Sequence, residues 1–290
     1  MNTMLQSMAL ILVTLLPCSL AASDFASRMD AADDLCREGR HEEAVAAYVA
    51  LAKASPEVER RYEALSAAAR CARLHLSSEA RALELCGEIG DPLYAKACRA
   101  VVYQWASSPA RVIEDLGEED LTLWPEELAA TGFMVRGQAH YNLDNGKEAV
   151  DDFVRAYQFS RGRDKWAALQ RLGDTFWHRL DDEILAEACY RKCMSDSGLA
   201  WPGLQSRVNL GSLLLAQQRH DAALQVFTGA PGATGTWRAA LLIGAARVHA
   251  ATGQPDAARS ALNEAIQVPG IHAWQKEEAE KLLDKIGVEP

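Results

Sequence analysis

Cysteine is the residue type in this sequence whose spacing comes closest to a chemical centre. Cys189 and Cys193 lie one helical turn apart, so on a helix their side chains point in the same direction. That geometry is unfavourable for a disulfide between them, but it would suit two ligands of a metal ion. Together with His178 they are the candidate centre of a thiol- or metal-dependent enzyme. No second ligand pair of suitable spacing accompanies them, so we expect no metal ion and no cofactor.

The other cysteines after the N-terminal segment, which is predicted below to be an export signal, are predicted to be packing residues or disulfide partners: Cys36, Cys71, Cys86 and Cys98. Cys86 and Cys193 take the place of packing residues in the helical stripes described below, which favours buried thiols. An even number of cysteines after an export signal also permits disulfides. Cys71 and Cys86 are the best disulfide candidates, because they could face each other across adjacent antiparallel helices.

The remaining polar residues show no catalytic arrangement. The sequence contains no Gly-x-Gly-x-x-Gly, no Walker-type phosphate loop, no Gly-x-Ser-x-Gly and no His-Glu-x-x-His. His140 and His249 occupy equivalent helical positions and are predicted to pack or to cap. Three acidic pairs are predicted to be solvated in loops or at helix starts, where the helix dipole favours them: Glu118/Glu119, Asp151/Asp152 and Asp181/Asp182. We therefore expect a protein that is not an enzyme.

The helical elements that would position these residues repeat along the chain. Packing residues spaced by four and then three lie on one face of a helix, and each such triplet is predicted to be a buried stripe. The triplets are Ala44/Tyr48/Leu51, Ala82/Cys86/Ile89, Ala149/Phe153/Ala156, Ala186/Tyr190/Cys193, Ala223/Phe227/Ala230 and Ala258/Leu262/Ala265. A period of about 34 to 37 residues that holds two helices indicates a helical solenoid.

The helix that precedes each of the last four stripes carries a small residue at a matching point: Gly137, Gly173, Gly211 and Ala246. A glycine inside a helix costs about 1 kcal/mol relative to alanine. Its recurrence therefore predicts a contact between helices that is too close for a larger side chain.

These residues resemble the tetratricopeptide repeat family, whose small position and alanine–aromatic–alanine signature they match. The resemblance covers residues 25–58 and 130–272, and residues 59–116 continue the helical pattern without the clean signature. It implies an all-α fold, a right-handed α-solenoid of antiparallel helix pairs that a C-terminal capping helix closes. We expect the following order: a signal peptide over 1–21, partly degenerate repeats over 22–116, an acidic linker or bend over 117–127, repeats over 128–272, and a capping helix and tail over 273–290.

In this family, the face of the repeats opposite the packing stripe commonly lines a concave groove that receives a peptide or helix. The resemblance places these residues on it: Met134, Gln138, Tyr141, Asn142, Gln170, Arg171, Asp174, Trp177, His178, Asn209 and Arg247. Tyr141 and Trp177 are the predicted anchors, since aromatic groups dominate interface energetics. The alternative is that both pack against adjacent repeats. Some family members grip a C-terminal carboxylate with Lys, Asn and Arg residues; only Arg171 and Asn209 resemble parts of that set, which disfavours such binding.

The net charge bears on the kind of partner, and the N-terminal segment bears on the location of the protein. A formal net charge of −10 and a sequence pI near 5.2 disfavour nucleic acid or an anionic membrane surface as the main partner. The first 23 residues carry no charged side chain, and the apolar run before Pro17 is too short to span a bilayer. This pattern predicts an export signal cleaved after Ala21. Acylation of Cys18 is the alternative, although Pro17 directly before it is a poor match.

The leading hypothesis is a non-enzymatic protein–protein interaction scaffold of the cell envelope or exported fraction, periplasmic or secreted. It would bind a peptide or helix of a partner protein in its concave groove. One alternative is an envelope-assembly lipoprotein acylated at Cys18, and membrane association is expected only in that case. A less favoured alternative is the thiol- or metal-dependent enzyme. Self-association stays open.

Overall fold

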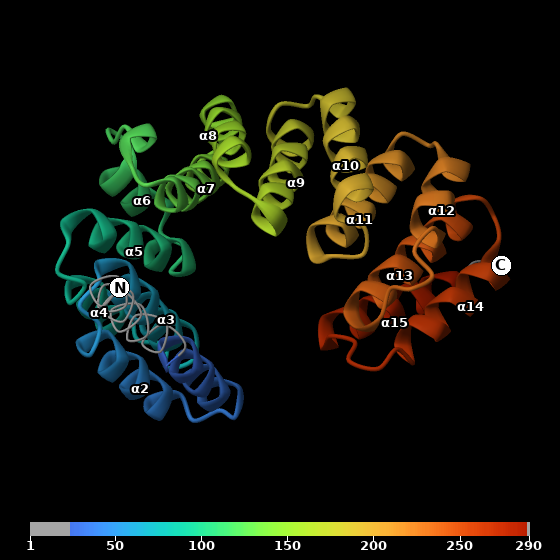
Figure 1. Ribbon diagram of the computed structural model, residues 1–290. Coiled ribbons are helices and arrows are strands. Elements are labelled where there is room, and N and C mark those ends of the chain that lie inside the picture. Colours follow the sequence, from blue (N-terminus) through green and yellow to red (C-terminus); the bar gives the residue numbers. More distant parts are fainter. Residues whose placement is uncertain (1–23, 289–290) are drawn as a thin grey trace, which may run out of the picture. The chain divides into compact units, whose positions relative to one another are not determined.

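The computed structural model describes residues 24–288, and Figure 1 shows their arrangement as a series of helices. No strand occurs within this range. The chain divides into two compact units between Asp120 and Leu121. The predicted signal peptide over 1–21 and its Cys18 lie outside the described residues.

The first unit is built from consecutive helix pairs. Residues 24–37 are helical and precede α2, and the hydroxyl of Tyr48 on α2 donates to Asp33. The helices that follow are α2 (His41–Lys53), α3 (Val58–Leu74), α4 (Glu79–Gly87), α5 (Pro92–Trp105) and α6 (Pro109–Leu116). Their starts follow ordinary capping chemistry: Pro92 is in the first turn of α5, and the Asp91 carboxylate accepts hydrogen bonds from the Leu93 and Tyr94 backbone amides.

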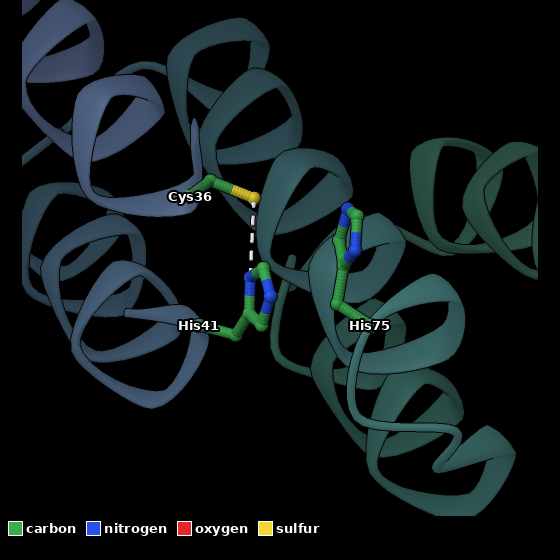
Figure 2. A group of neighbouring side chains, drawn as sticks. All are labelled: Cys36, His41 and His75. Atoms are coloured by element: carbon green, nitrogen blue, oxygen red, sulfur yellow. Dashed lines mark hydrogen bonds between the residues drawn. The ribbon is translucent and has the colours of Figure 1, made fainter. Parts of the chain in front are cut away.

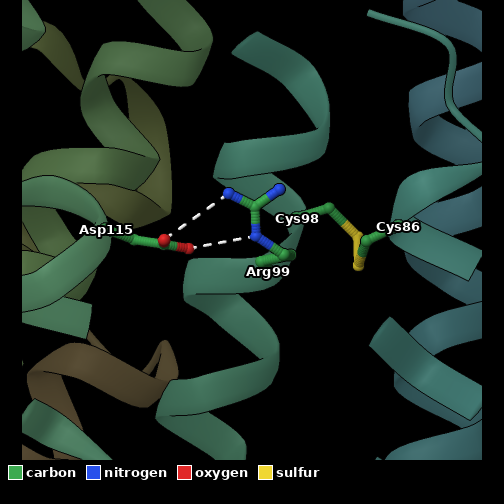
Figure 3. Close-up of a disulfide and its surroundings, with 4 residues drawn as sticks. All are labelled: Cys86, Cys98, Arg99 and Asp115. Atoms are coloured by element: carbon green, nitrogen blue, oxygen red, sulfur yellow. Dashed lines mark hydrogen bonds and ion pairs between the residues drawn. A yellow bond between two sulfur atoms is a disulfide. The ribbon is translucent and has the colours of Figure 1, made fainter. Parts of the chain in front are cut away.

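A disulfide between Cys86 and Cys98 ties α4 to α5 in this unit, with Cα atoms 5.5 Å apart. Figure 3 shows it beside the ion pair of Arg99 with Asp115, which joins α5 to α6. The predicted disulfide between Cys71 and Cys86 is therefore wrong. Cys86 on α4 faces forward to α5, whereas Cys71 on α3 lies 3.6 Å from Cys36, nearer the start of the chain.

The second unit repeats the same plan. Its elements are η1 (Leu121–Leu123), α7 (Glu126–Asn142), α8 (Gly146–Phe159), α9 (Gly162–Arg179), α10 (Glu183–Ser197), α11 (Trp201–Ala216), α12 (His220–Thr228), α13 (Gly235–Ala251), α14 (Pro255–Ile266) and α15 (Ala273–Val288). Each helix contacts the next, and the first helices of successive pairs also contact one another, α7 with α9, α9 with α11 and α11 with α13. The terminal α15 packs on α13 and α14, as expected of a capping helix.

The predicted stripes are the core of both units, since every member of the six triplets is buried. The glycines mark the closest helix–helix contacts. A Cβ added at Gly137 would lie 2.9 Å from the Phe153 ring, and one added at Gly173 would lie 2.6 Å from Tyr190. The prediction of contacts too close for a larger side chain is thus confirmed at these positions.

The acidic pair Asp151/Asp152 departs from its predicted place, since both residues lie in the middle of α8. Asp152 was expected in a loop or at a helix start, but it lies within α8 and is 5% exposed. The Arg136 guanidinium on α7 donates to it, with Nε 2.9 Å from Oδ2 and Nη2 2.8 Å from Oδ1. Burial raises the pKa of Asp152, and the ion pair with Arg136 opposes that rise. The ion pair with Arg136 offsets the free-energy cost of removing the Asp152 carboxylate from water.

Candidate partner-binding face

The first helices of the second unit carry the residues predicted to bind a partner, and we call their surface the first-helix face. It comprises Met134, Gln138, Tyr141 and Asn142 on α7, Gln170, Arg171, Asp174, Trp177 and His178 on α9, Asn209 on α11 and Arg247 on α13. Because α7, α9, α11 and α13 contact in that order, these residues lie on neighbouring helices. Their exposure differs from residue to residue.

Tyr141 is a half-buried aromatic whose position α9 holds. The Arg179 guanidinium lies 4.1 Å from the centre of its ring, a cation–π contact. Arg179 Nε also donates to the Tyr141 carbonyl oxygen at 2.8 Å and pairs with Asp144 at 3.2 Å. Burial raises the pKa of the Tyr141 phenol. One arginine thus joins the end of α9 to the end of α7 and orients the aromatic ring.

Trp177 and His178 form the second aromatic feature of the face. Their rings stack with centroids 4.3 Å apart and an interplanar angle of 27°. Trp177 is half-buried and packs against the apolar cluster that includes Leu210 and Leu214, while His178 is exposed. The indole is thus packed against the core on one side and stacked with an exposed imidazole on the other, so the pair has both apolar and polar surface.

Asp174 lies on the same helix as Trp177 and His178 and is 8% exposed. Its Oδ1 accepts from the Tyr190 hydroxyl at 2.8 Å and from Asn209 Nδ2 at 2.7 Å, and its Oδ2 accepts from Gln170 Nε2 at 2.5 Å. Arg171 adds an ion pair at 3.6 Å. Burial raises the pKa of Asp174, and the Tyr190 hydrogen bond opposes that rise. This network, the Asp174 network below, fastens α9 to α10 and α11.

Other predicted residues of the face are placed in different ways. Gln170 is 2% exposed, so it and Asp174 support the face from within, and their direct contact with a partner stays a prediction. Gln138 Nε2 donates to the exposed Asn142 at 3.0 Å, and Met134 is half-buried. Arg247 is exposed and pairs with Glu278 on α15.

The predicted thiol centre is not assembled. Among residues 24–288, the donor atoms of Cys189, Cys193 and His178 do not form a group close enough to share a metal ion. Burial raises the pKa of the Cys189 thiol to about 11 and also raises that of Cys193, whose Sγ donates to the Trp166 carbonyl at 3.4 Å. A protonated thiol is a weak nucleophile, so these surroundings do not activate either sulfur.

Two histidines, His140 and His249, make equivalent contacts. His140 Nδ1 lies 3.4 Å from Asn145 Nδ2, and His249 Nδ1 lies 3.0 Å from Gln254 Oε1. In both cases the imidazole near the end of a first helix meets the residue just before the second helix. The two contacts are equivalent in the repeat, and each joins two side chains across the turn between paired helices.

Every helix within residues 24–288 is too short or too polar to cross a membrane.

Comparison with known proteins identifies the repeat. Residues 205–268, which span most of α11, all of α12 and α13, and α14, match the sequence model of the tetratricopeptide repeat. No curated protein matches the chain.

Two solved structures share its fold. One is a tetratricopeptide repeat protein from Parabacteroides merdae, with a TM-score of 0.54 and 16% identity over 91% of this chain and 98% of that one. The other is the Cut9–Hcn1 hetero-tetramer of the APC/C, with a TM-score of 0.57 and 16% identity over 89% of this chain and 48% of that one. At these identities the likeness concerns the fold.

Proposed function

Because this chain is a tetratricopeptide repeat protein, we propose that it is a non-enzymatic scaffold that binds an extended or helical segment of a partner protein along the first-helix face. The observation that carries the proposal is the pair of partly exposed aromatic groups on adjacent helices, Tyr141 under Arg179 and Trp177 under His178. Buried aromatic anchors of this kind supply most of the energy in protein interfaces.

The support beneath the face favours binding by a preformed surface. The Asp174 network joins α9, α10 and α11, and Arg179 joins α9 to α7. Because these helices and side chains are already held in place, they lose little conformational entropy when a partner binds, and more of the interaction energy contributes to affinity. A partner segment that follows α7, α9 and α11 would meet polar groups beside Tyr141 and apolar groups beside Trp177.

Site-specific photo-cross-linking in the native host tests the proposal. A photoreactive amino acid replaces the exposed His178 on the first-helix face in one protein and Ile184 on α10 in another. Ile184 is 83% exposed and is the rival surface. We expect a discrete adduct from position 178 and none from position 184. An adduct from position 184 alone would move the interface to the second helices and contradict the proposal.

A matched pair of tryptophan variants shows whether the aromatic anchor binds. Trp177→Ala should abolish the adduct formed from position 178, while Trp274→Ala should leave it unchanged. Trp274 on α15 is 61% exposed and lies outside the first-helix face. Circular dichroism and gel filtration establish that both variants are folded. An adduct that survives Trp177→Ala at full yield would exclude Trp177 as an anchor.

We further propose that the protein is exported and that residues 1–21 are its signal. The Cys86–Cys98 disulfide supports this proposal, because structural disulfides persist mainly in oxidising compartments. Mass analysis of the mature N-terminus, with cell fractionation, tests it. A chain that starts at Ala22 supports cleavage after Ala21, and one that starts at an acylated Cys18 supports the lipoprotein alternative. An uncleaved chain in the cytosol would contradict export.

A further inference from the structure

Two cysteines and two histidines meet in the first unit, whereas the first-helix face belongs to the second. Figure 2 shows three of them: Cys36 near the end of helix 24–37, His41 at the start of α2, and His75 directly after α3. One donor atom from each lies within 4.8 Å of the others. Cys71 in the last turn of α3 is the fourth, with its Sγ 3.6 Å from Cys36 Sγ. We call this group the Cys/His cluster.

Two distances within the cluster match those between the ligands of one tetrahedral ion. With Zn–S near 2.3 Å and Zn–N near 2.0–2.1 Å, a tetrahedral site separates two sulfurs by about 3.8 Å and a sulfur from a nitrogen by about 3.6 Å. Here the two sulfurs are 3.6 Å apart, and Cys36 Sγ lies 3.8 Å from His41 Nδ1. The pairs Cys36–Cys71 and Cys36–His41 therefore already have the separations expected for two edges of such a tetrahedron.

His75 can join the other three ligands through a rotation of its side chain. The His75 ring stacks on the His41 ring, with centroids 4.4 Å apart and an interplanar angle of 7°. His75 is exposed, so its side chain can turn toward the sulfurs at little cost. Cys71, by contrast, is 2% exposed and held in place.

We propose that Cys36, His41, Cys71 and His75 bind a zinc ion. Two thiolates and two neutral imidazoles form a standard set for a closed, structural zinc site. The ion would connect helix 24–37 and the start of α2 to the end of α3, so it would fasten the first helix pair of the chain to the second. Its role is structural, and it is independent of partner binding by the second unit.

The alternative for these residues is a disulfide between Cys36 and Cys71. Their sulfurs are 3.6 Å apart, whereas a disulfide bond requires about 2.05 Å. Cys86 and Cys98 in the same unit are bonded to each other, whereas Cys36 and Cys71 are both free cysteines. A disulfide would also leave the convergence of His41 and His75 on the sulfurs unexplained.

Cobalt substitution of the full mature chain tests the proposal. The protein is treated with chelator and a non-thiol reductant mild enough to spare Cys86–Cys98, and Co²⁺ is then added as the spectroscopic probe. We expect one equivalent to bind, with the strong d–d bands of a tetrahedral site and a thiolate-to-cobalt charge-transfer band. One equivalent of Zn²⁺ should displace it. Zinc should also raise the melting temperature, since it binds only the folded unit.

Variants assign the ligands. Cys36→Ser and His41→Ala should each abolish the cobalt spectrum, and Cys189→Ser should keep it, because Cys189 is a free cysteine outside the cluster. His75→Ala changes an exposed side chain and keeps the fold, so its loss of the four-coordinate spectrum cannot be attributed to unfolding. Circular dichroism checks the other variants.

Three results would overturn the proposal. The first is no binding of cobalt or zinc by the reduced wild type. The second is an unchanged spectrum in Cys36→Ser or His75→Ala. The third is a Cys36–Cys71 disulfide in protein isolated from the host, detected by peptide mapping without prior reduction.

Discussion

Among single residues, Asp174 joins three helices through one carboxylate. Tyr190 comes from α10 and Asn209 from α11, and both donate to the same oxygen. All its partners are donors, so the charged form is well matched to its surroundings. Even so, burial is the largest influence on its pKa and raises it. The side chain therefore gives the second unit a dependence of stability on pH.

The sign of that dependence is testable with Asp174→Asn. A raised pKa in the folded state means that the folded protein binds this proton more tightly than the unfolded one, so stability falls as pH rises from the unfolded pKa, near 3.9, through the folded value. Asparagine keeps an oxygen for Tyr190 and Asn209 and cannot ionise. We expect the variant to gain stability relative to wild type as pH rises from about 4 to 7. Urea unfolding at several pH values measures this difference.

A difference that stays constant over that range would show that Asp174 titrates normally. The control is Asp151→Asn, which changes the exposed neighbour of the buried Asp152 and should show no such trend.

At the scale of elements, the contact between helices depends on glycine. Phe227 on α12 lies between Gly211 on α11 and Gly244 on α13. A Cβ at Gly211 would lie 2.5 Å from the phenyl ring, and a Cβ at Gly244 would lie 2.2 Å from it. The ring therefore cannot move away from α11 without meeting α13. The buried ring is thus enclosed by two helices whose approach requires the absence of a side chain.

Gly211→Ala should therefore destabilise the protein by about 1–3 kcal/mol, even though alanine is the better helix former. The matched control is Gly87→Ala on α4, where an added Cβ would meet no atom within 4 Å. That change should be neutral or stabilise by up to about 1 kcal/mol. Equilibrium urea denaturation compares the two. Equal effects would refute the close-contact explanation.

Turns between paired helices show a second requirement of the backbone. Gly253 adopts a left-handed φ of +69°, and Gln218 occupies the corresponding place between α11 and α12 with φ of +59°. A left-handed conformation costs a residue with a Cβ about 1–2 kcal/mol. The left-handed backbone is therefore strained at Gln218, which has a Cβ, and unstrained at Gly253, which has none.

Gln218→Gly should stabilise the second unit by up to about 1 kcal/mol, because it removes this strain and offsets the greater freedom of glycine in the unfolded chain. Gly253→Ala should have the opposite effect, a loss of about 1 kcal/mol. Thermal unfolding of both variants tests the pair. A loss of stability in Gln218→Gly would mean that the greater freedom of glycine in the unfolded chain outweighs the strain.

For the whole molecule, the division at Asp120/Leu121 separates a disulfide-linked unit from one in which the described cysteines, Cys189 and Cys193, are free. The loop that Cys86 and Cys98 close has a sequence separation of 12 residues. Such a crosslink stabilises by about 3 kcal/mol, chiefly by restricting the unfolded chain.

Cys98→Ser should therefore destabilise the first unit by about 3 kcal/mol and leave the second unchanged. Hydrogen–deuterium exchange with peptide resolution is the suitable measurement, because each unit reports separately. We expect faster exchange in peptides from residues 24–120 and unaltered exchange in those from 121–288. Uniformly faster exchange would show that the two units unfold together.

The sequence by itself determined the helix pairs, the buried stripes and the glycine contacts. These follow from periodicity: apolar positions at spacings of four and three define one helical face, and their repetition every 34 to 37 residues, roughly, defines the stacking. That His140 and His249 make equivalent contacts was predictable for the same reason, since the two residues hold equivalent positions.

Only the tertiary structure decided which side chains meet between helices. Asp174 and Asn209 are 35 residues apart, and Arg136 and Asp152 are 16 apart. Such contacts depend on the rotation of each helix about its own axis. A stripe of buried positions shows which face is inside but does not fix this rotation closely enough to predict individual contacts. The same freedom explains the wrong disulfide, because spacing favoured Cys71 as the partner of Cys86 and only the structure pairs Cys86 with Cys98. The Cys-x4-His and Cys-x3-His spacings at Cys36 and Cys71 were a usable signal, but only the packing of α3 against α2 brings the two halves within reach of one ion.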